Sequence, residues 1–242
     1  MILEEEVEML SRSAPSQLQV LKYAVKGRYI AVQLSSGACG LAYYPRDTAQ
    51  QHPHMSDHDA LSSAKLALSE DLGEKSLGIA VVNALSTAFY TELRVKLGNP
   101  LNLISVEGRV VAMVGYFQPL LRRFYKAKEL RIVERKSIEG VYPPSRAEEA
   151  LKGASIVLIT GSSLVYGGME EYLRYSGGAE TVIVMGPTSS MLPEPFFKKG
   201  AHIVAGFRVT DCNSLFGLDE ISRDSLFTYG EKMYLVCNSL EQ

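Results

Sequence analysis

The chain has 242 residues, of which 46% are hydrophobic and 21% are charged, a composition typical of a globular protein with an extensive core. The formal net charge of −2 gives no electrostatic reason to expect binding to nucleic acid or to an anionic membrane. The three cysteines lie far apart and form no C-x-x-C pair, which gives no indication of a disulfide framework, and we expect reduced thiols that fill the core: Cys39, Cys212 and Cys237.

The first residues predict a short surface helix over positions 2–12, because apolar side chains recur there near helical spacing among glutamates. The segment M-I-L-E-E-E-V-E-M-L is acidic where a signal peptide would be basic. No apolar run approaches the ~18 residues that a membrane span needs. We therefore expect a cytoplasmic protein.

An antiparallel meander is predicted next. Residues 18–34 and 38–44 are rich in valine, isoleucine and tyrosine, and the intervening S-S-G is a turn signal, so each range is predicted as a strand. Residues 45–58 are polar and predict a loop. Residues 59–72 place their leucines on one helical face and predict a helix.

A further helix, predicted over residues 76–97, is apolar almost all round, which is typical of a buried helix. It carries a polar stripe at helical spacing, made of Asn83, Thr87, Tyr90 and Arg94. Two interpretations stay open. Either these are core polar groups that end at an exposed terminus, or Asn83 lines a ligand cleft, because a buried amide without partners is costly.

From about residue 105 the pattern changes to short apolar runs that alternate with helical segments, which predicts a parallel sheet buried on both faces. The predicted strands are 110–114, 130–133, 156–159, 182–185 and 203–205, and the predicted helices are 119–126, 148–151, 169–175 and 194–199. N-P-L-N at 99–102 marks a boundary. We therefore predict an α/β protein with one domain over residues 1–104 and a second over residues 105–242.

Polar and glycine-containing segments follow the predicted parallel strands. They are G-Y-F-Q-P (115–119), E-R-K (134–136), T-G-S-S (160–163) and G-P-T-S-S (186–190). Ligands of doubly wound sheets bind outside the carboxyl ends of the strands. Glycine lets a ligand approach the main chain, and hydroxyls and free amides at helix starts can hold an anion or a polar ring edge. The sequence therefore predicts a binding site here.

The dinucleotide fingerprint G-x-G-x-x-G is missing, because only Gly115 is present. Glu134 lies 19 residues later, about where a Rossmann protein keeps its ribose-binding acid, so ribose binding and an ordinary charged strand end both stay open. Ser162 and Ser163 lie outside a G-x-S-x-G motif, which favours turn formation and helix capping over a catalytic triad. Glu134 and Glu194 are the carboxylates nearest the predicted site, and either would act as a base if burial raised its pKa.

Three of the four histidines fall in H-P-H-M-S-D-H at positions 52–58. Imidazole and carboxylate groups suit divalent transition metals, so His52, His54 and His58 are candidate metal ligands. No standard structural-zinc spacing is matched. A solvated loop in which histidines cluster by chance is the alternative.

Six segments occur in a recognisable order: G-I-A-V-V-N-A-L (78–85), V-G-Y-F-Q-P (114–119), V-E-R (133–135), T-G-S-S-L-V-Y-G-G (160–168), M-G-P-T-S-S-M-L-P-E-P-F-F (185–197) and G-A-H-I-V-A-G-F-R-V-T-D (200–211). Together they resemble the DUF364 family of heavy-metal chelation proteins with its amino-terminal DUF4213 partner domain. The resemblance implies an enolase N-terminal-like α+β domain followed by a Rossmann-like parallel-sheet domain, with a site in the cleft between them.

By this resemblance the first domain supplies Asn83 to the cleft. The second domain supplies Gly115, Phe117, Pro119, Thr160, Gly161, Ser162, Gly186, Pro187, Thr188 and Ser189. The family often has histidine where this chain has Tyr116, and asparagine where it has Tyr166, which counts against proton transfer at both positions. We expect Tyr116 and Phe117 to stack on a planar ring. The histidine cluster is not a motif of the family.

The sequence leaves three functions open. The first is an enzyme of condensation, hydrolysis or group transfer on a small heterocyclic or chelating molecule in chelator or pterin-like metabolism, with Asn83 and Glu134 pointing into a deep pocket. The second is a non-catalytic heavy-metal or metal-chelate binding protein that depends on His52 and His54. The third, weakened by the missing glycine-rich loop, is an S-adenosylmethionine-dependent methyltransferase. The cofactor is left open, with a divalent transition metal as the candidate, and a homo-oligomer is also left open.

Overall fold

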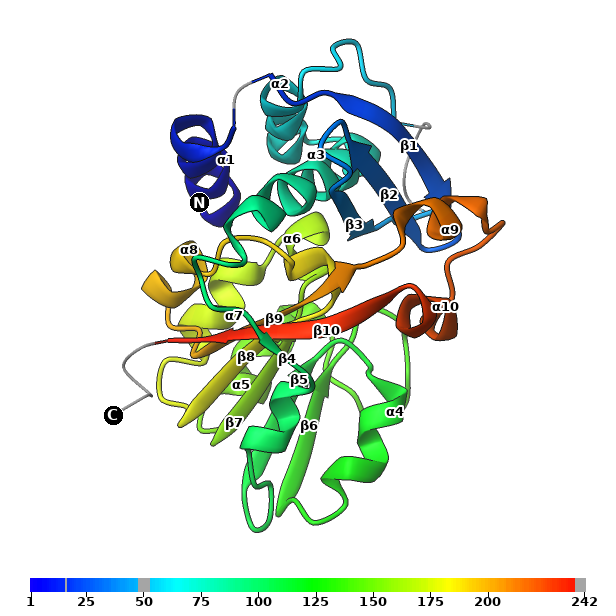
Figure 1. The fold of residues 1–242 in the computed structure, drawn as a ribbon. Helices are drawn as coiled ribbons and strands as arrows, with labels where there is room; N and C mark the ends of the chain where they lie inside the picture. The colour runs from blue at the N-terminus through cyan, green and yellow to red at the C-terminus, as the bar shows by residue number, and fades with distance from the viewer. Residues whose placement is uncertain (16, 48–52, 238–242) are drawn as a thin grey trace.

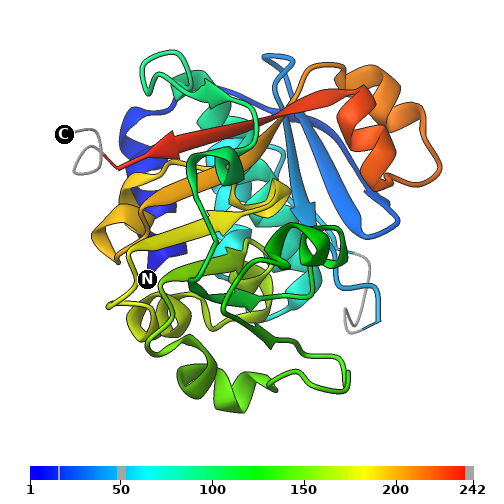
Figure 2. The same cartoon turned by 90° about the horizontal axis from the view of Figure 1, so that it is seen from below.

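The computed structural model of this protein describes residues 1–15, 17–47 and 53–237. A three-stranded antiparallel sheet and a seven-stranded, mostly parallel sheet organise these residues (Figure 1). Helices lie around both sheets, and the second view shows the small sheet standing against the carboxyl-end side of the large one (Figure 2). The predicted α/β class is therefore confirmed.

The small sheet is a meander of β1 (Val20–Lys26), β2 (Tyr29–Leu34) and β3 (Cys39–Tyr43), in that order. The prediction of one continuous strand over residues 18–34 is wrong. Gly27, with φ +69°, turns the chain between β1 and β2, which then pair antiparallel. A lone glycine between Lys26 and Arg28 is a weak turn signal, which is why this turn is missed in the prediction.

Of the predicted helices of the first half, the first is confirmed and the two that follow the small sheet are shorter than predicted. The observed helices are α1 (Ile2–Ser13), α2 (Ala60–Ala64), η1 (Lys65–Leu68), α3 (Leu72–Ser86) and η2 (Thr87–Phe89). Asp71 begins α3, because its side chain accepts the N–H groups of Gly73 and Glu74 at 2.8 and 2.9 Å. The predicted helix over 76–97 ends early, and Arg94 has the left-handed φ of +52°. The predicted polar stripe is therefore not one helical face.

Helix α3 is buried on almost every side, as its sequence predicts, and all residues from Ser76 to Ser86 are buried. Two glycines permit its close packing. A Cβ atom on Gly40 of β3 would lie 2.0 Å from the carbonyl oxygen of Ala80, and one on Gly78 would lie 1.9 Å from the amide nitrogen of Ala67. Only glycine allows backbones to approach this closely.

The large sheet has the strand order β4-β10-β9-β8-β7-β5-β6. The strands are β4 (Lys96–Leu97), β5 (Val110–Val114), β6 (Glu129–Val133), β7 (Ile156–Thr160), β8 (Thr181–Met185), β9 (Ile203–Val209) and β10 (Gly230–Val236). Strands β5 to β9 pair in parallel, whereas β10 and β4 pair antiparallel at one edge. The five parallel strands are predicted from the sequence and these two are missed: β4 has only two residues, and the prediction overlooks the apolar run of β10, residues 233–236.

Short helices connect the strands of the large sheet. They are η3 (Pro100–Leu103), α4 (Gln118–Leu121), η4 (Arg122–Phe124), η5 (Pro144–Arg146), α5 (Ala147–Leu151), α6 (Ser163–Tyr166), α7 (Met169–Tyr175), η6 (Pro187–Ser189), α8 (Glu194–Lys198), α9 (Cys212–Gly217) and α10 (Arg223–Thr228). Across the part of the chain that the structure describes, no helix is long and apolar enough to cross a membrane.

The direction of chain progression through the sheet reverses beside β5, because β6 lies on one side of this strand and β7 on the other. Alternate residues of β5 enter different apolar clusters. Val111 and Met113 pack with residues of η3 and α4, whereas Ala112 and Val114 pack with residues of α5, α7 and α3. In doubly wound sheets a reversal of this kind opens a crevice at the carboxyl ends of the strands.

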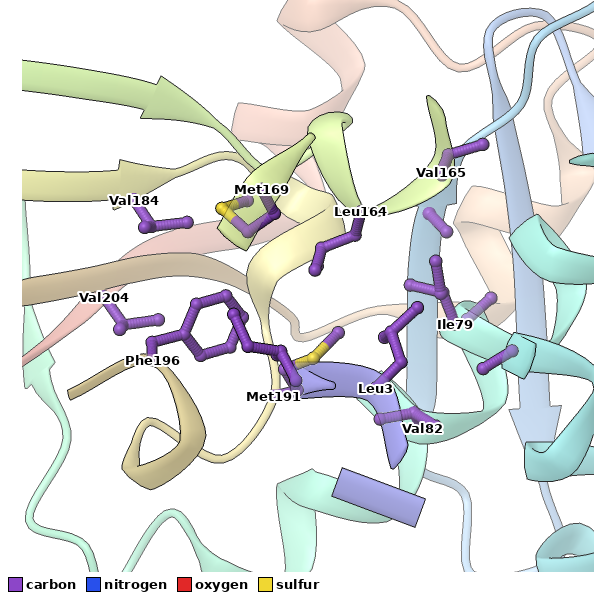
Figure 3. Packing of buried hydrophobic residues seen from close by; sticks show 14 of the residues in the cluster. Leu3, Ile79, Val82, Leu164, Val165, Met169, Val184, Met191, Phe196 and Val204 are labelled. Carbon is purple, nitrogen blue, oxygen red and sulfur yellow. The ribbon is translucent and has the colours of Figure 1, made fainter. Parts of the chain in front are cut away.

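A single apolar cluster joins the two sheets (Figure 3). Leu3 of α1 and the α3 residues Ile79 and Val82 lie beside Met191 and Phe196 from the second half of the chain (Figure 3). This shared core fixes the small sheet relative to the large one. The division into domains at residue 104 stays a prediction.

Candidate functional site

A cleft of about 940 Å³ opens at the carboxyl ends of β5, β6, β7 and β8, at the reversal in strand order. Residues of the small sheet, among them Tyr29 and Tyr43, close its other side. Of the thirteen ligand-binding residues that the sequence predicts, ten line it: Gly115, Tyr116, Phe117, Pro119, Glu134, Thr160, Ser162, Gly186, Pro187 and Thr188. The other three, Asn83, Gly161 and Ser189, lie behind its wall.

The loop after β5 is held by its backbone. Gly115 has φ +94° and donates its N–H to the carbonyl oxygen of Val133 at 2.8 Å. A Cβ atom at this position would lie 3.0 Å from the Thr160 methyl group, so both the backbone angle and the space favour glycine. Pro119 stands in the first turn of α4. The Tyr116 and Phe117 side chains are thereby placed along the cleft.

Glu134 lines the cleft but is bonded to the main chain. Its Oε2 accepts the N–H of Tyr116 at 2.8 Å, and its Oε1 accepts the N–H of Lys136 at 3.0 Å. The carboxylate therefore ties the loop after β6 to the loop after β5. This arrangement positions the two loops and leaves less of the carboxylate for a ribose or for a role as a base.

The loop after β7 presents two hydroxyls and packs against the next loop. Thr160 Oγ1 and Ser162 Oγ are hydrogen-bonded at 3.0 Å, and both residues line the cleft. A Cβ atom on Gly161 would lie 2.9 Å from the amide nitrogen of Ser189. None of the described histidines lines the cleft, so the described residues offer no partner for a Ser162 or Ser163 nucleophile.

The hydroxyls of the loop after β8 are bonded within the protein. Thr188 Oγ1 accepts the N–H of Tyr43 at 2.9 Å. Ser189 Oγ, which is buried, lies within 2.9 Å of two backbone carbonyl oxygens. Ser190 Oγ accepts the N–H of Phe207 at 2.8 Å. These hydroxyls therefore brace the loop, whereas the sequence suggests that they hold an anion.

Asn83 is buried behind this loop, with 1% of its surface exposed. Its Nδ2 group donates to the carbonyl oxygens of Leu41, Pro187 and Thr188, at 2.6, 3.2 and 3.1 Å. Three converging carbonyl oxygens require a donor, which fixes the orientation of the amide. Asn83 thus joins β3 to the loop after β8 and positions the wall of the cleft.

Sequence reasoning missed the most distinctive group on the wall. The Tyr43 and Tyr166 hydroxyls lie 3.2 Å apart, and the Arg135 guanidinium lies 4.0 Å from the centre of the Tyr166 ring. Burial, followed by the hydrogen bond to Tyr166, raises the pKa of Tyr43, so this phenol keeps its proton. In the sequence this group is visible only as an arginine directly after Glu134 and as two tyrosines in distant segments. No sequence pattern indicates that these residues meet.

The cleft carries an excess of positive charge. Its described lining has four basic side chains and two acidic ones: Arg28, Arg135, Lys136, Lys232, Asp47 and Glu134. The Glu134 carboxylate already accepts two amide N–H groups. Clefts lined by one sign of charge concentrate ligands of the opposite sign.

The predicted metal ligands lie apart from the cleft or cannot be placed. His52 lies outside the described residues. His54 is exposed, and His58 Nδ1 lies 3.2 Å from the carbonyl oxygen of Val20. Within residues 1–15, 17–47 and 53–237, no three His, Cys, Asp or Glu side chains gather as a metal site would need. The described donor set therefore does not fit a metal held by the protein alone.

Two family models match the chain, both described as "Putative heavy-metal chelation". DUF4213 matches residues 7–86 and DUF364 matches residues 99–218. An uncharacterised protein of Methanocaldococcus jannaschii is 27% identical over 176 residues, which are 70% of this chain and 68% of that protein.

Two solved structures of proteins of unknown function from the DUF364 family share the fold. The one from Pyrococcus horikoshii has a TM-score of 0.83 at 19% identity and covers 98% of both chains. The one from Desulfitobacterium hafniense has a TM-score of 0.80 at 21% identity and covers 97% of this chain and 98% of that one. With both family models matched in order and the fold shared along its length, the chain belongs to the DUF364 family and carries the DUF4213 domain ahead of it.

Proposed function

We propose that the cleft binds a small, planar, anionic molecule: a heterocycle with carboxylate groups, free or as its chelate with a divalent transition metal. The observation that carries this proposal is the Arg135 guanidinium over the Tyr166 ring, at 4.0 Å, on a wall where basic side chains outnumber acidic ones. A guanidinium is suited to bidentate contact with a carboxylate, and a ring that it stacks on holds it in place.

The neighbouring side chains supply the rest of the recognition. The Tyr116 and Phe117 rings line the cleft from the loop after β5 and offer faces for stacking on a flat ligand. The Tyr43 and Tyr166 hydroxyls are hydrogen-bonded to each other, and the proton that this bond does not use can be donated to a carboxylate. The cleft volume of about 940 Å³ lies in the range of small-molecule sites.

In this proposal a metal is cargo that arrives inside its ligand. The described side chains form no group of three metal ligands, and of the two carboxylates in the described lining that of Glu134 is already bonded to two amides. A chelator that surrounds the metal with its own carboxylates and ring nitrogen needs only charge and stacking from the protein. This reading agrees with the description of the family.

We propose a binding function in preference to an enzymatic one. Condensation, hydrolysis and group transfer need an acid or a base at the reacting atoms. The described lining offers tyrosine hydroxyls, the Asp47 carboxylate at the side of the small sheet, and the Glu134 carboxylate, whose oxygens hold the loops. The same two hydrogen bonds occupy the oxygens that a nucleoside ribose would use, so an adenosyl ligand is less favoured.

Calorimetric titration with three probes tests the proposal: dipicolinate, which is a flat pyridine with two carboxylates, Ni²⁺ alone, and the dipicolinate complex of Ni²⁺. We expect dipicolinate or its complex to bind, and Arg135→Ala to weaken this binding by roughly tenfold, as the loss of a charge-assisted contact would. Arg146→Ala is the matched control, because Arg146 lies 5.1 Å over the Tyr142 ring and does not line the cleft.

The outcomes separate the alternatives. Equal weakening by Arg135→Ala and Arg146→Ala would contradict a site at Arg135. Binding of Ni²⁺ alone, unchanged by Arg135→Ala, would move the metal to the segment of His52 and His54. If none of the three probes binds, the proposal for this ligand class is wrong.

A further inference from the structure

The fold brings together two cysteines that are far apart in the sequence. Cys39 opens β3 and Cys212 opens α9, and both side chains belong to one apolar cluster, where their thiols lie close enough to interact. Both are free thiols. Cys39 is 6% exposed, whereas Cys212 is only partly buried. The Cys212 thiol is therefore accessible from solvent, whereas the Cys39 thiol is reached through Cys212.

The surroundings of the pair distinguish the two sulfur atoms. Both belong to the apolar cluster between the small sheet and α9, in which Leu215 and Ile221 are buried. Lys22 on β1 is the positive charge that faces the pair, and its Nζ lies 4.5 Å from the centre of the Phe216 ring.

The two thiols differ in acidity as a result. The hydrogen bond from Cys39 and then the Lys22 charge lower the pKa of Cys212, and they outweigh burial and the charge of Asp211, which act in the opposite direction. The same hydrogen bond and burial raise the pKa of Cys39. Redox-sensitive cysteines combine this acidity and exposure with a second thiol placed to resolve the first product.

We propose that Cys212 and Cys39 form a reversible thiol–disulfide site that exchanges with low-molecular-weight disulfides, with Cys212 as the attacking thiol and Cys39 as the resolving thiol. The Cys212 thiolate attacks one sulfur of the small disulfide, forming a mixed disulfide and releasing one small thiolate. Cys39 then loses its proton and attacks Cys212 Sγ, which forms the internal disulfide and releases the second small thiol. Two protein thiols are oxidised while one small disulfide is reduced to two thiols.

The crosslink would join parts of the chain that the cleft depends on. Segment 210–229, which follows β9, lies against the small sheet (Figure 1). There the N–H of Ile221 donates to the carbonyl oxygen of Lys26 at 3.3 Å. Leu226 and Phe227 of α10 line the cleft from this segment. Oxidation would fix the segment to β3, the strand that carries Tyr43. The thiol pair itself does not line the cleft.

The test is to incubate the full chain with oxidised glutathione, alkylate the remaining thiols, and measure intact and peptide masses. The expected wild-type product has lost two hydrogen atoms, carries no glutathione, and yields one crosslinked peptide pair containing Cys39 and Cys212. Cys39→Ser is expected to keep glutathione on Cys212, because no resolving thiol remains. Cys237→Ser is the control and should form the same crosslink as the wild type.

Stable glutathione on Cys212 of the wild type would overturn the proposal, as would a crosslink that uses Cys237 or no oxidation at all. The wild-type result requires no variant to fold. A second readout concerns acidity: Cys212 should react with iodoacetamide faster in the wild type than in Cys39→Ala, which removes the hydrogen-bond donor, at the same pH. Equal rates would remove the assigned role of the hydrogen bond. These measurements involve no cleft ligand, so they are independent of the proposed function.

Discussion

The loop after β8 and the loop after β5 are built alike and used differently. Both follow a buried parallel strand, both begin at a glycine with positive φ, and both continue into a short helix with proline in its first turn. In residues 186–190 the hydroxyls are buried and bonded to backbone groups, with Asn83 beneath them. In residues 115–119 the backbone is tied down, while Tyr116 remains 38% exposed beside the cleft.

Residues 186–190 therefore form a supporting loop, and residues 115–119 form a recognition loop. Hydroxyls that accept or donate within the protein hold a shape and are not free to bind a ligand. Aromatic side chains on a fixed backbone offer a surface to a ligand without further ordering of the chain. Substitutions in the supporting loop should therefore change stability, and substitutions in the recognition loop should change binding.

The largest expected effect is a loss of stability when Asn83, beneath the supporting loop, is replaced. In Asn83→Asp a carboxylate would face the three carbonyl oxygens of Leu41, Pro187 and Thr188. We expect the free energy of unfolding to fall by about 3–5 kcal/mol at pH 7, because a buried charge is left without a partner. Urea unfolding measures this loss. Asn102→Asp, at an exposed position, is the control, and a loss below about 1 kcal/mol for Asn83→Asp would contradict the assigned support.

The next effect concerns Glu6, which is completely buried on α1 and lies near Glu194, beyond the supporting loop. Burial raises its pKa well above 4.5, so the folded protein holds this proton more tightly than the unfolded chain. This contribution to stability is full at pH values below 4.5 and is lost as the pH rises toward the folded-state pKa, at up to about 1.4 kcal/mol per pH unit.

Thermal unfolding between pH 4 and pH 9 checks this dependence. Glu6→Gln should flatten the decline in stability as the pH rises. Glu8→Gln, an exposed change on the same helix, should leave the decline as it is in the wild type. A wild-type decline that persists in Glu6→Gln would assign the pH dependence to other groups.

A smaller loss is expected from Tyr90→Phe. The Tyr90 hydroxyl is buried and donates to the carbonyl oxygen of Ser190 at 2.8 Å, at the end of the supporting loop. Its removal should lower the free energy of unfolding by about 1–1.5 kcal/mol, the usual size of one buried hydrogen bond. Tyr125→Phe, at a position that is 76% exposed, is the matched control. Equal unfolding midpoints for the two variants would contradict this role.

The smallest effect on stability should come from the recognition loop. Tyr116→Ala is expected to change the free energy of unfolding by less than about 0.5 kcal/mol, because the side chain is exposed. The same variant should weaken dipicolinate binding in the calorimetric titration. A large loss of stability with unchanged affinity would reverse the assignment of the two loops.

The sequence predicts elements well where the pattern is local. Strand β5 and helix α7 have the predicted bounds, because a continuous apolar run and a clear helical period specify them. The helix predicted over 76–97 was too long, since η2, the left-handed Arg94 and β4 follow Ser86 without a proline or a change in composition. Strand β10 was missed although residues 233–236 form a short apolar run, because its antiparallel pairing with β9 and β4 does not follow from the alternation of strands and helices.

Most of the candidate residues that the sequence predicts lie at one cleft, but their contacts were not predicted, and their role in binding stays a prediction. The ends of the parallel strands could be read from the apolar runs, and most predicted residues line the cleft. The hydrogen bonds of the Thr188 and Ser189 hydroxyls within the protein could not be predicted from the sequence, because their partners lie on distant segments, at Tyr43 and on β9. The Arg135–Tyr166 pair and the two neighbouring cysteines likewise arise from tertiary contacts between distant segments.

The apolar cluster shared by the two sheets constrains how such a chain can vary over time. Leu3 and Val82 lie beside Met191 and Phe196, so a change in volume on one side leaves a void or a clash on the other. Neither half can be exchanged for that of a distant relative without matching changes across this seam. The two modules are therefore expected to be inherited as a pair, with compensating substitutions at these positions.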